Sequence, residues 1–301
     1  MIKSAFIFFL LLISVFLSAC SSVPEKEQPI SPSQEEELLI PSPVKREPSG
    51  YSEVKIYFDG LLSDRGFYKN QILFMAPEAI CRYFELECET KISEDGFMIS
   101  FPGLSLCGKP EQEYVIANDR YLYTPYFYIE HDGRIYLSQD IIERVFGVKL
   151  NFSPEEMKAE MDYAVLNLIK GGENYYIANY PNEELYWLSR VIYAEAKDQP
   201  MAGLIGVGNV VYNRVESDDF PHTVFDVIFD NKNVVQFDPT ATGGILGEPD
   251  RRSEIAACLC MEGYNTVGDC MFFVNPDRGN STWFDKELEF VVSLGDHDFY
   301  R

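Results

Sequence analysis

The chain has 301 residues and a formal net charge of −23 at pH 7, with 46% hydrophobic and 24% charged residues. This length supports two modest globular domains besides any leader segment. The negative charge argues against a nucleic-acid-binding role, because the phosphate backbone would be repelled. Binding to any other anionic polymer would have to depend on local stacking and hydrogen bonds rather than on long-range attraction.

The first twenty residues have the pattern of an export signal. Lys3 precedes an apolar run from Ala5 to Leu17, and Ser18-Ala19-Cys20 follows. The run is short for a membrane span, and the small residues before Cys20 closely resemble a bacterial lipoprotein signal. The resemblance implies that residues 1–19 are removed and that Cys20 is lipidated, so that the protein is extracytoplasmic and anchored to the membrane by lipid. The alternatives are a secretory signal with an incidental Cys20 and an uncleaved anchor.

Residues 20–50 are rich in proline, serine and glutamate and have almost no aromatic content. Such a segment cannot bury enough apolar surface to offset the entropy of ordering it. We expect a disordered tether that carries a domain away from the membrane surface.

Residues 51–152 have a globular composition and a weak internal repeat. One copy predicts a strand at 69–74 and a helix at 76–84. The other predicts a turn and then a strand within 131–137, a helix that stops at Gly147, and a further strand at 148–152. Together they resemble the copper amine oxidase N-terminal-like domain, an accessory module of secreted bacterial proteins. The stretch has one histidine, His131, without a second ligand at metal-binding spacing, so we expect no metal here. A spacer or wall-binding role is favoured.

Residues 153–181 connect this module to a second domain. Ser153 and Pro154 are typical of a helix start, which predicts a helix that could run to Leu168. Gly171-Gly172 then breaks the chain. The second domain, residues 182–301, begins at Asn182, which can cap its first helix.

Glu195 is the candidate catalytic residue. It follows Leu188 and Ile192 on the apolar stripe of a predicted helix, where burial and the helix C-terminus should both raise its pKa. A carboxyl group with a raised pKa can act as a general acid near neutral pH. The alternative is that the helix ends near Ala194 and that Glu195 turns to solvent.

The second domain resembles the catalytic domain of the SleB/CwlJ cell wall hydrolase family. The resemblance lies in RVIYAEAKDQPMAGLIGVGNVVYNRV, FPHTVFDVIF, Gln236-Phe237, MFFVNP, Trp283 and LGDHDFY. It implies a lysozyme-like fold, peptidoglycan as substrate and Glu195 as catalytic acid. The family usually has a second acidic residue four positions later, where this chain has Gln199. The whole chain is therefore expected to be α+β, with a mainly helical catalytic domain after a small repeat-built α+β module.

A second helix should follow Pro200, and its Gly203, Gly206 and Gly208 predict close approach of another backbone, for which the Glu195 helix is the expected neighbour. Several residues are candidates for substrate binding, each with a structural alternative. The amides could cap or stabilise loops, Trp283 could lie in the core instead of forming a sugar platform, and for His297 a structural role is favoured. The candidates are Tyr193, Asn213, Gln236, Phe237, Asn275, Trp283 and His297.

One well-placed acid without an obvious partner predicts a lytic transglycosylase, which cleaves between N-acetylmuramic acid and N-acetylglucosamine without a second carboxylate. Asp226, Asp238, Glu248 or Asp285 could supply a second acid, and the enzyme would then be a muramidase. A non-catalytic wall-binding lipoprotein is the other alternative. Neither enzymatic route needs a metal or cofactor, and the sequence identifies no protein partner.

The six cysteines other than Cys20 could form one bridge per domain or remain reduced.

Overall fold

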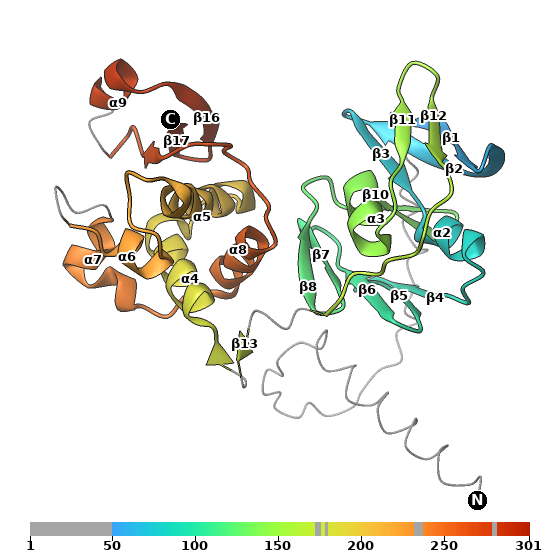
Figure 1. The fold of residues 1–301 in the computed structure, drawn as a ribbon, viewed down its shortest axis with the longest axis horizontal. Coiled ribbons are helices and arrows are strands. Elements are labelled where there is room, and N and C mark those ends of the chain that lie inside the picture. The colour runs from blue at the N-terminus through green and yellow to red at the C-terminus, as the bar shows by residue number, and fades with distance from the viewer. Residues whose placement is uncertain (1–49, 172–175, 178–179, 232–236, 279–281) are drawn as a thin grey trace, which may run out of the picture. The chain divides into compact units, whose positions relative to one another are not determined.

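The computed structural model describes residues 50–171, 176–177, 180–231, 237–278 and 282–301 (Figure 1). All of them belong to one compact unit, Lys45–Arg301. The predicted signal peptide, Cys20, almost all of the tether and Gln236 lie outside the described residues. Among the described helices, none is long and apolar enough to cross a membrane.

A seven-stranded sheet organises the first part of this unit, in the order β11-β12-β1-β2-β3-β10-β9. Neighbouring strands are antiparallel except for β1 and β12, which are parallel. The strands are β1 Ser52–Phe58, β2 Leu61–Lys69, β3 Ile72–Met75, β9 Ile129–His131, β10 Arg134–Ser138, β11 Asn151–Ser153 and β12 Lys158–Met161.

Two strand-helix units recur in this part, as the internal repeat predicts. Strand β3 leads into α2 (Pro77–Tyr83), and β10 leads into α3 (Gln139–Phe146). The two strands lie side by side in the sheet. Helix α3 ends at Gly147, which has a φ of 65° and whose missing Cβ would lie 2.4 Å from the carbonyl oxygen of Asn167. The predicted stop at this glycine is confirmed, because other residues would be strained and crowded here.

A five-stranded antiparallel sheet between the two repeat copies is the part that the sequence analysis missed. Its strands follow one another in chain order, and its inner face buries Ile99, Leu106 and Leu122. The strands are β4 Glu89–Ser93, β5 Gly96–Phe101, β6 Leu104–Gly108, β7 Tyr114–Ala117 and β8 Arg120–Tyr123.

The helix predicted from Ser153 to Leu168 is wrong. This segment forms β11, a turn and β12, which pairs in parallel with β1. Ala159 and Met161 are buried alternately along β12, so the strand period decides its orientation rather than the cap-like start at Ser153. Met157, with a φ of 48°, is the turn residue that reverses the chain.

The second part of the unit is mainly helical, and it begins after the short pair β13 (Tyr176–Ile177) and β14 (Tyr180–Pro181). Helices α4, α5 and α8 pack against one another, and a three-stranded sheet in the order β15-β17-β16 follows. The mixed α+β class is therefore confirmed. The elements are α4 Glu183–Ala196, α5 Met201–Glu216, α6 Val224–Ile228, α7 Asp238–Thr242, η1 Gly244–Leu246, α8 Arg251–Met261, β15 Phe272–Val274, α9 Thr282–Glu287, β16 Phe290–Leu294 and β17 His297–Tyr300.

The glycines of α5 allow close packing, but only one of them faces the Glu195 helix. At Gly208 a Cβ would lie 3.0 Å from Ile192 Cδ1 of α4 and 2.6 Å from Cys260 Sγ of α8. Gly206 faces Phe299 of β17, and Gly203 faces the residues before α5 and the end of β16. Helix α5 is thus enclosed by several elements rather than by α4 alone.

The described cysteines have free thiols in this structure.

Candidate active site

Helix α4 holds Glu195 in its last turn. Asn182 caps the helix by accepting a hydrogen bond from the Leu185 N–H at 2.7 Å, as expected from the sequence. Leu188 and Ile192 on the predicted stripe are fully buried, and the helix continues to Ala196. The alternative in which the helix ends at Ala194 and releases Glu195 to solvent is therefore wrong.

The environment of Glu195 disfavours its charged form. Burial and, to a smaller extent, the negative charge of Asp238 together raise the pKa of this carboxyl group to about 7. Near neutral pH the group can therefore both give and take a proton, as acid-base catalysis requires.

Asp238 is the one of the four candidate second acids whose charge acts on Glu195. It is an exposed residue at the start of α7, which contacts α4. The other three interact with other partners. Asp226 accepts a hydrogen bond from Thr223, Glu248 pairs with Arg190 at 2.9 Å, and Asp285 accepts one from the Tyr300 hydroxyl.

Gln199 has a structural task at the position where the resembling family usually has an acid. Its amide oxygen accepts a hydrogen bond from the Asp296 N–H at 2.7 Å, and its amide nitrogen donates one to the Asp296 carboxylate at 3.3 Å. The side chain is 7% exposed. It therefore ties the start of α5 to the turn between β16 and β17.

Two of the predicted substrate-binding residues are held inside the fold. Asn213 donates its amide hydrogens to the carbonyl oxygens of Gly268 and Cys270, both at 2.8 Å, which leaves only its amide oxygen for a ligand. Phe237 is 1% exposed, and the Arg214 guanidinium lies 5.3 Å from its ring centroid. Its ring belongs to the core, so contact between this ring and a sugar is not supported.

His297 and Asn275 also make local contacts. The His297 ring is buried at 5.3 Å from the Phe273 ring, and burial lowers its pKa. This placement agrees with the structural role favoured from the sequence. Asn275 accepts the Asp277 N–H at 3.0 Å and so stabilises the turn after β15.

Tyr193 and Trp283 retain surface that a ligand could reach. Tyr193 is half-buried on α4, two residues before Glu195, and Lys197 lies over its ring. Trp283 is 53% exposed in α9 and packs edge-on against Phe284. A sugar ring can pack against an exposed indole ring, so this placement is compatible with the predicted sugar platform.

Sequence reasoning did not foresee the ion pair of Arg190 with Glu248. Arg190 is 6% exposed on α4, and its guanidinium lies 3.8 Å from the centroid of the Tyr186 ring. A charged residue within an otherwise apolar helix face was the signal that could have indicated a partner. Within the described ranges, no cluster of three or more histidine, cysteine and acidic side chains could hold a metal ion.

Comparison with known proteins gives relatives for the C-terminal part. The spore cortex-lytic enzyme of Bacillus cereus is 28% identical over 122 residues, which are 40% of this chain and 46% of that protein. The spore cortex-lytic enzyme of Bacillus subtilis is 28% identical over 142 residues, or 47% and 43% of the two chains. The chain thus spans less than half the length of these curated relatives.

Among solved structures, the catalytic domain of the germination-specific lytic transglycosylase SleB from Bacillus anthracis is 27% identical. The alignment covers 42% of this chain and 100% of that one, with a TM-score of 0.37. The family model described as Cell Wall Hydrolase matches residues 198–300, beginning three residues after Glu195. By sequence, the C-terminal part of this chain is therefore similar to the SleB cell wall hydrolases.

Proposed function

We propose that this protein is a peptidoglycan-cleaving enzyme, a lytic transglycosylase that acts on the glycosidic bond between N-acetylmuramic acid and N-acetylglucosamine. The observation that carries the proposal is Glu195, a half-buried carboxyl group with a pKa of about 7 beside a segment that matches cell wall hydrolases. The similarity to spore cortex-lytic enzymes supports the same substrate class.

In the proposed reaction Glu195 acts twice. Its protonated carboxyl group gives its proton to the glycosidic oxygen, and the bond between that oxygen and C1 of the muramoyl residue breaks. The resulting carboxylate then takes the proton of the muramoyl C6 hydroxyl while O6 forms a bond to C1. The product is a 1,6-anhydro sugar, no water is consumed, and Glu195 returns to its protonated form.

The alternative reaction, that of a muramidase, would require Asp238 to take part in the chemistry. If it activated a water molecule or attacked C1, the product would have a reducing muramoyl end, as in a muramidase. Its exposure and its separate place on α7 leave it solvated, whereas Glu195 is desolvated. We therefore assign the acid-base role to Glu195 and a purely electrostatic effect to Asp238.

We further propose that the enzyme is extracytoplasmic and attached to the membrane by a lipid on Cys20. The small residues before Cys20 support this location, and peptidoglycan is the substrate found there. Labelling with a radioactive or alkyne-tagged fatty acid should modify the wild-type chain and not the Cys20→Ala variant. Labelling of both chains would contradict the assignment.

Mass spectrometry of the sugars released from purified peptidoglycan tests the catalytic proposal. Vegetative wall and spore cortex should both be used, with the full-length chain, Glu195→Gln, and Glu184→Gln as a matched exposed control on the same helix. We expect anhydromuramoyl products whose release falls at least about 100-fold in Glu195→Gln and persists in the control. Reducing ends would instead indicate a hydrolase, and binding to sacculi without any release would indicate a wall-binding lipoprotein.

A further inference from the structure

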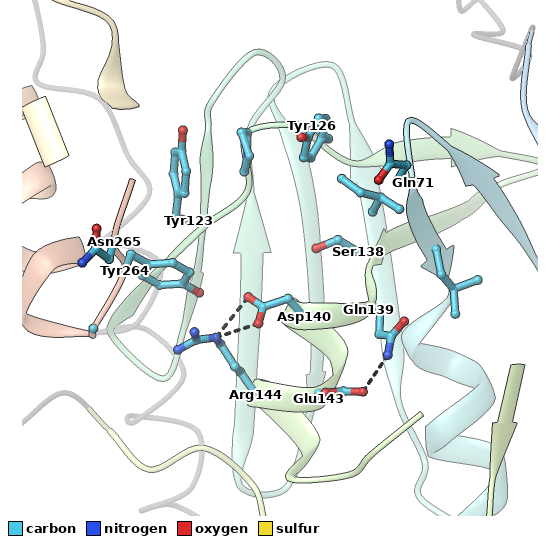
Figure 2. A pocket seen from close by; sticks show the side chains of 14 residues that line it. Gln71, Tyr123, Tyr126, Ser138, Gln139, Asp140, Glu143, Arg144, Tyr264 and Asn265 are labelled. Carbon is cyan, nitrogen blue, oxygen red and sulfur yellow. Dashed lines mark hydrogen bonds and ion pairs between the residues drawn. The ribbon is translucent and has the colours of Figure 1, made fainter. Parts of the chain in front are cut away.

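A cavity of about 620 Å³ lies outside the candidate active site (Figure 2). Its size is within the range of small-ligand sites. None of the predicted site residues lines it. Its walls come from β3, the segment after β8, the start of α3 and the loop after α8, and the lining residues that matter here are Tyr123, Tyr126, Ser138, Asp140, Arg144 and Tyr264.

Contacts between the two sides of this cavity hold its walls together. The Arg144 guanidinium lies 4.4 Å from the centroid of the Tyr264 ring, which also packs edge-on against Tyr123. The cavity is thus bounded by side chains that fix one another, which favours a preformed site.

The charged groups around the cavity are already neutralised by one another. Arg144 donates from Nε to both oxygens of Asp140 at 3.0 Å, as the dashed lines in Figure 2 show. Glu143 pairs with Lys149 at 2.5 Å and accepts a hydrogen bond from Gln139 at 2.8 Å. A charged ligand would have to break these pairs, so the cavity favours an uncharged one.

The remaining lining consists of aromatic rings and neutral polar groups. Tyr126 is 46% exposed, and Ser138 stands at the start of α3 without using its hydroxyl as a cap. A ligand rich in hydroxyl groups can hydrogen-bond to such neutral polar groups while its C–H faces pack on the rings.

We propose that this cavity binds an uncharged N-acetylhexosamine unit of a glycan strand, as a second glycan-binding site separate from the one that contains Glu195. The choice of this sugar class rests on the proposed function. The site would hold one part of the strand while another part of the strand is cleaved.

Binding of the N-acetylglucosamine tetramer tests the proposal. Titration calorimetry should use the full-length chain in detergent with Glu195→Gln as the common background. In that background we compare Tyr126→Ala, Tyr126→Phe and, as a control, Tyr163→Ala, which removes an 84% exposed tyrosine outside the cavity. We expect about tenfold weaker binding at one site for Tyr126→Ala. Tyr126→Phe and Tyr163→Ala should stay within about twofold of the background protein.

Unchanged binding in Tyr126→Ala, or an equal loss in Tyr163→Ala, would overturn the proposal. So would a peptidoglycan stem peptide that binds more tightly than the glycan and loses its affinity in Tyr126→Ala. Sugar release by the protein with intact Glu195 is measured separately. Failure of catalysis and failure of the second site therefore give different results.

Discussion

Glu195 couples the proposed chemistry to the stability of the fold. Its pKa is raised from 4.5 to about 7 in the folded protein. Below about pH 4.5 the carboxyl group is protonated in both the folded and the unfolded state, so burial costs nothing through ionisation. Between about pH 4.5 and pH 7 the unfolded state loses this proton first, so rising pH increasingly favours the unfolded state, in which the carboxylate is solvated. A catalytic acid of this kind therefore destabilises the protein at the pH where it works.

The variant Glu195→Gln should remove this pH dependence. Between pH 5 and pH 8 the wild-type protein should lose on the order of 3 kcal/mol more unfolding free energy than the variant. Urea unfolding of both proteins at the two pH values measures the difference, in which the titration of all other groups cancels. An equal loss of unfolding free energy in the two proteins would mean that Glu195 is not desolvated.

Asp238 should tune the pH range of activity. Its negative charge raises the pKa of Glu195, so Asp238→Asn should lower that pKa and move the alkaline limb of the rate profile to lower pH. Asp226→Asn is a matched control, because Asp226 is bound to Thr223 and does not contribute to the Glu195 shift. An unshifted limb in Asp238→Asn would exclude the electrostatic role. Loss of all activity at every pH would instead indicate that Asp238 takes part in the chemistry.

At the level of elements, Gln199 links α5 to the turn between β16 and β17. Gly295 in this turn has a φ of 63°, and a Cβ there would lie 2.2 Å from the Gln199 amide oxygen. The amide both accepts from the Asp296 backbone and faces the Asp296 carboxylate as a donor. A carboxylate at position 199 would face a second carboxylate, which accounts for glutamine here in physical terms.

Gln199→Glu should therefore destabilise the protein by about 1 to 3 kcal/mol at neutral pH. The loss should shrink when Asp296→Asn is added, because the amide then supplies the missing donor. Thermal unfolding of the two single variants and the double variant measures this coupling. Additive losses would show that the two side chains do not interact.

Elements could be predicted from the sequence where local signals, such as a helix cap or an apolar stripe, agree with the packing of the fold. The cap at Asn182, the apolar stripe of α4 and the stop at Gly147 are each decided within a few residues, and all three are present. The segment after Ser153 was mispredicted because β12 is specified by its pairing with the distant strand β1. Asp238 could be named only as one of four acids, because its place near Glu195 depends on how α7 lies against α4.

For the whole molecule, charge is the dominant property. A net charge of −23 should repel the carboxylates of peptidoglycan, the proposed substrate. Adding salt shortens the distance over which this repulsion acts, from about 30 Å at 0.01 M to about 8 Å at 0.15 M.

We therefore expect activity on sacculi to rise when NaCl is increased from about 10 to 150 mM. An uncharged soluble glycan fragment serves as the control substrate and should be cleaved at similar rates in both buffers. A steady fall in activity on sacculi with salt would contradict the repulsion argument.

The parallel pairing of β1 with β12 has a mechanical consequence. The chain enters the seven-stranded sheet at one end of β1 and leaves it at the opposite end of β12, and backbone hydrogen bonds such as Lys55 N–H to Met157 O join the two segments. A pull along the chain loads these bonds together in shear instead of opening them one after another. In single-molecule stretching, handles at residues 51 and 162 should thus meet a higher unfolding force than handles that peel β2 from β3. We therefore expect the module that precedes the hydrolase-like part to resist unfolding when the chain is pulled.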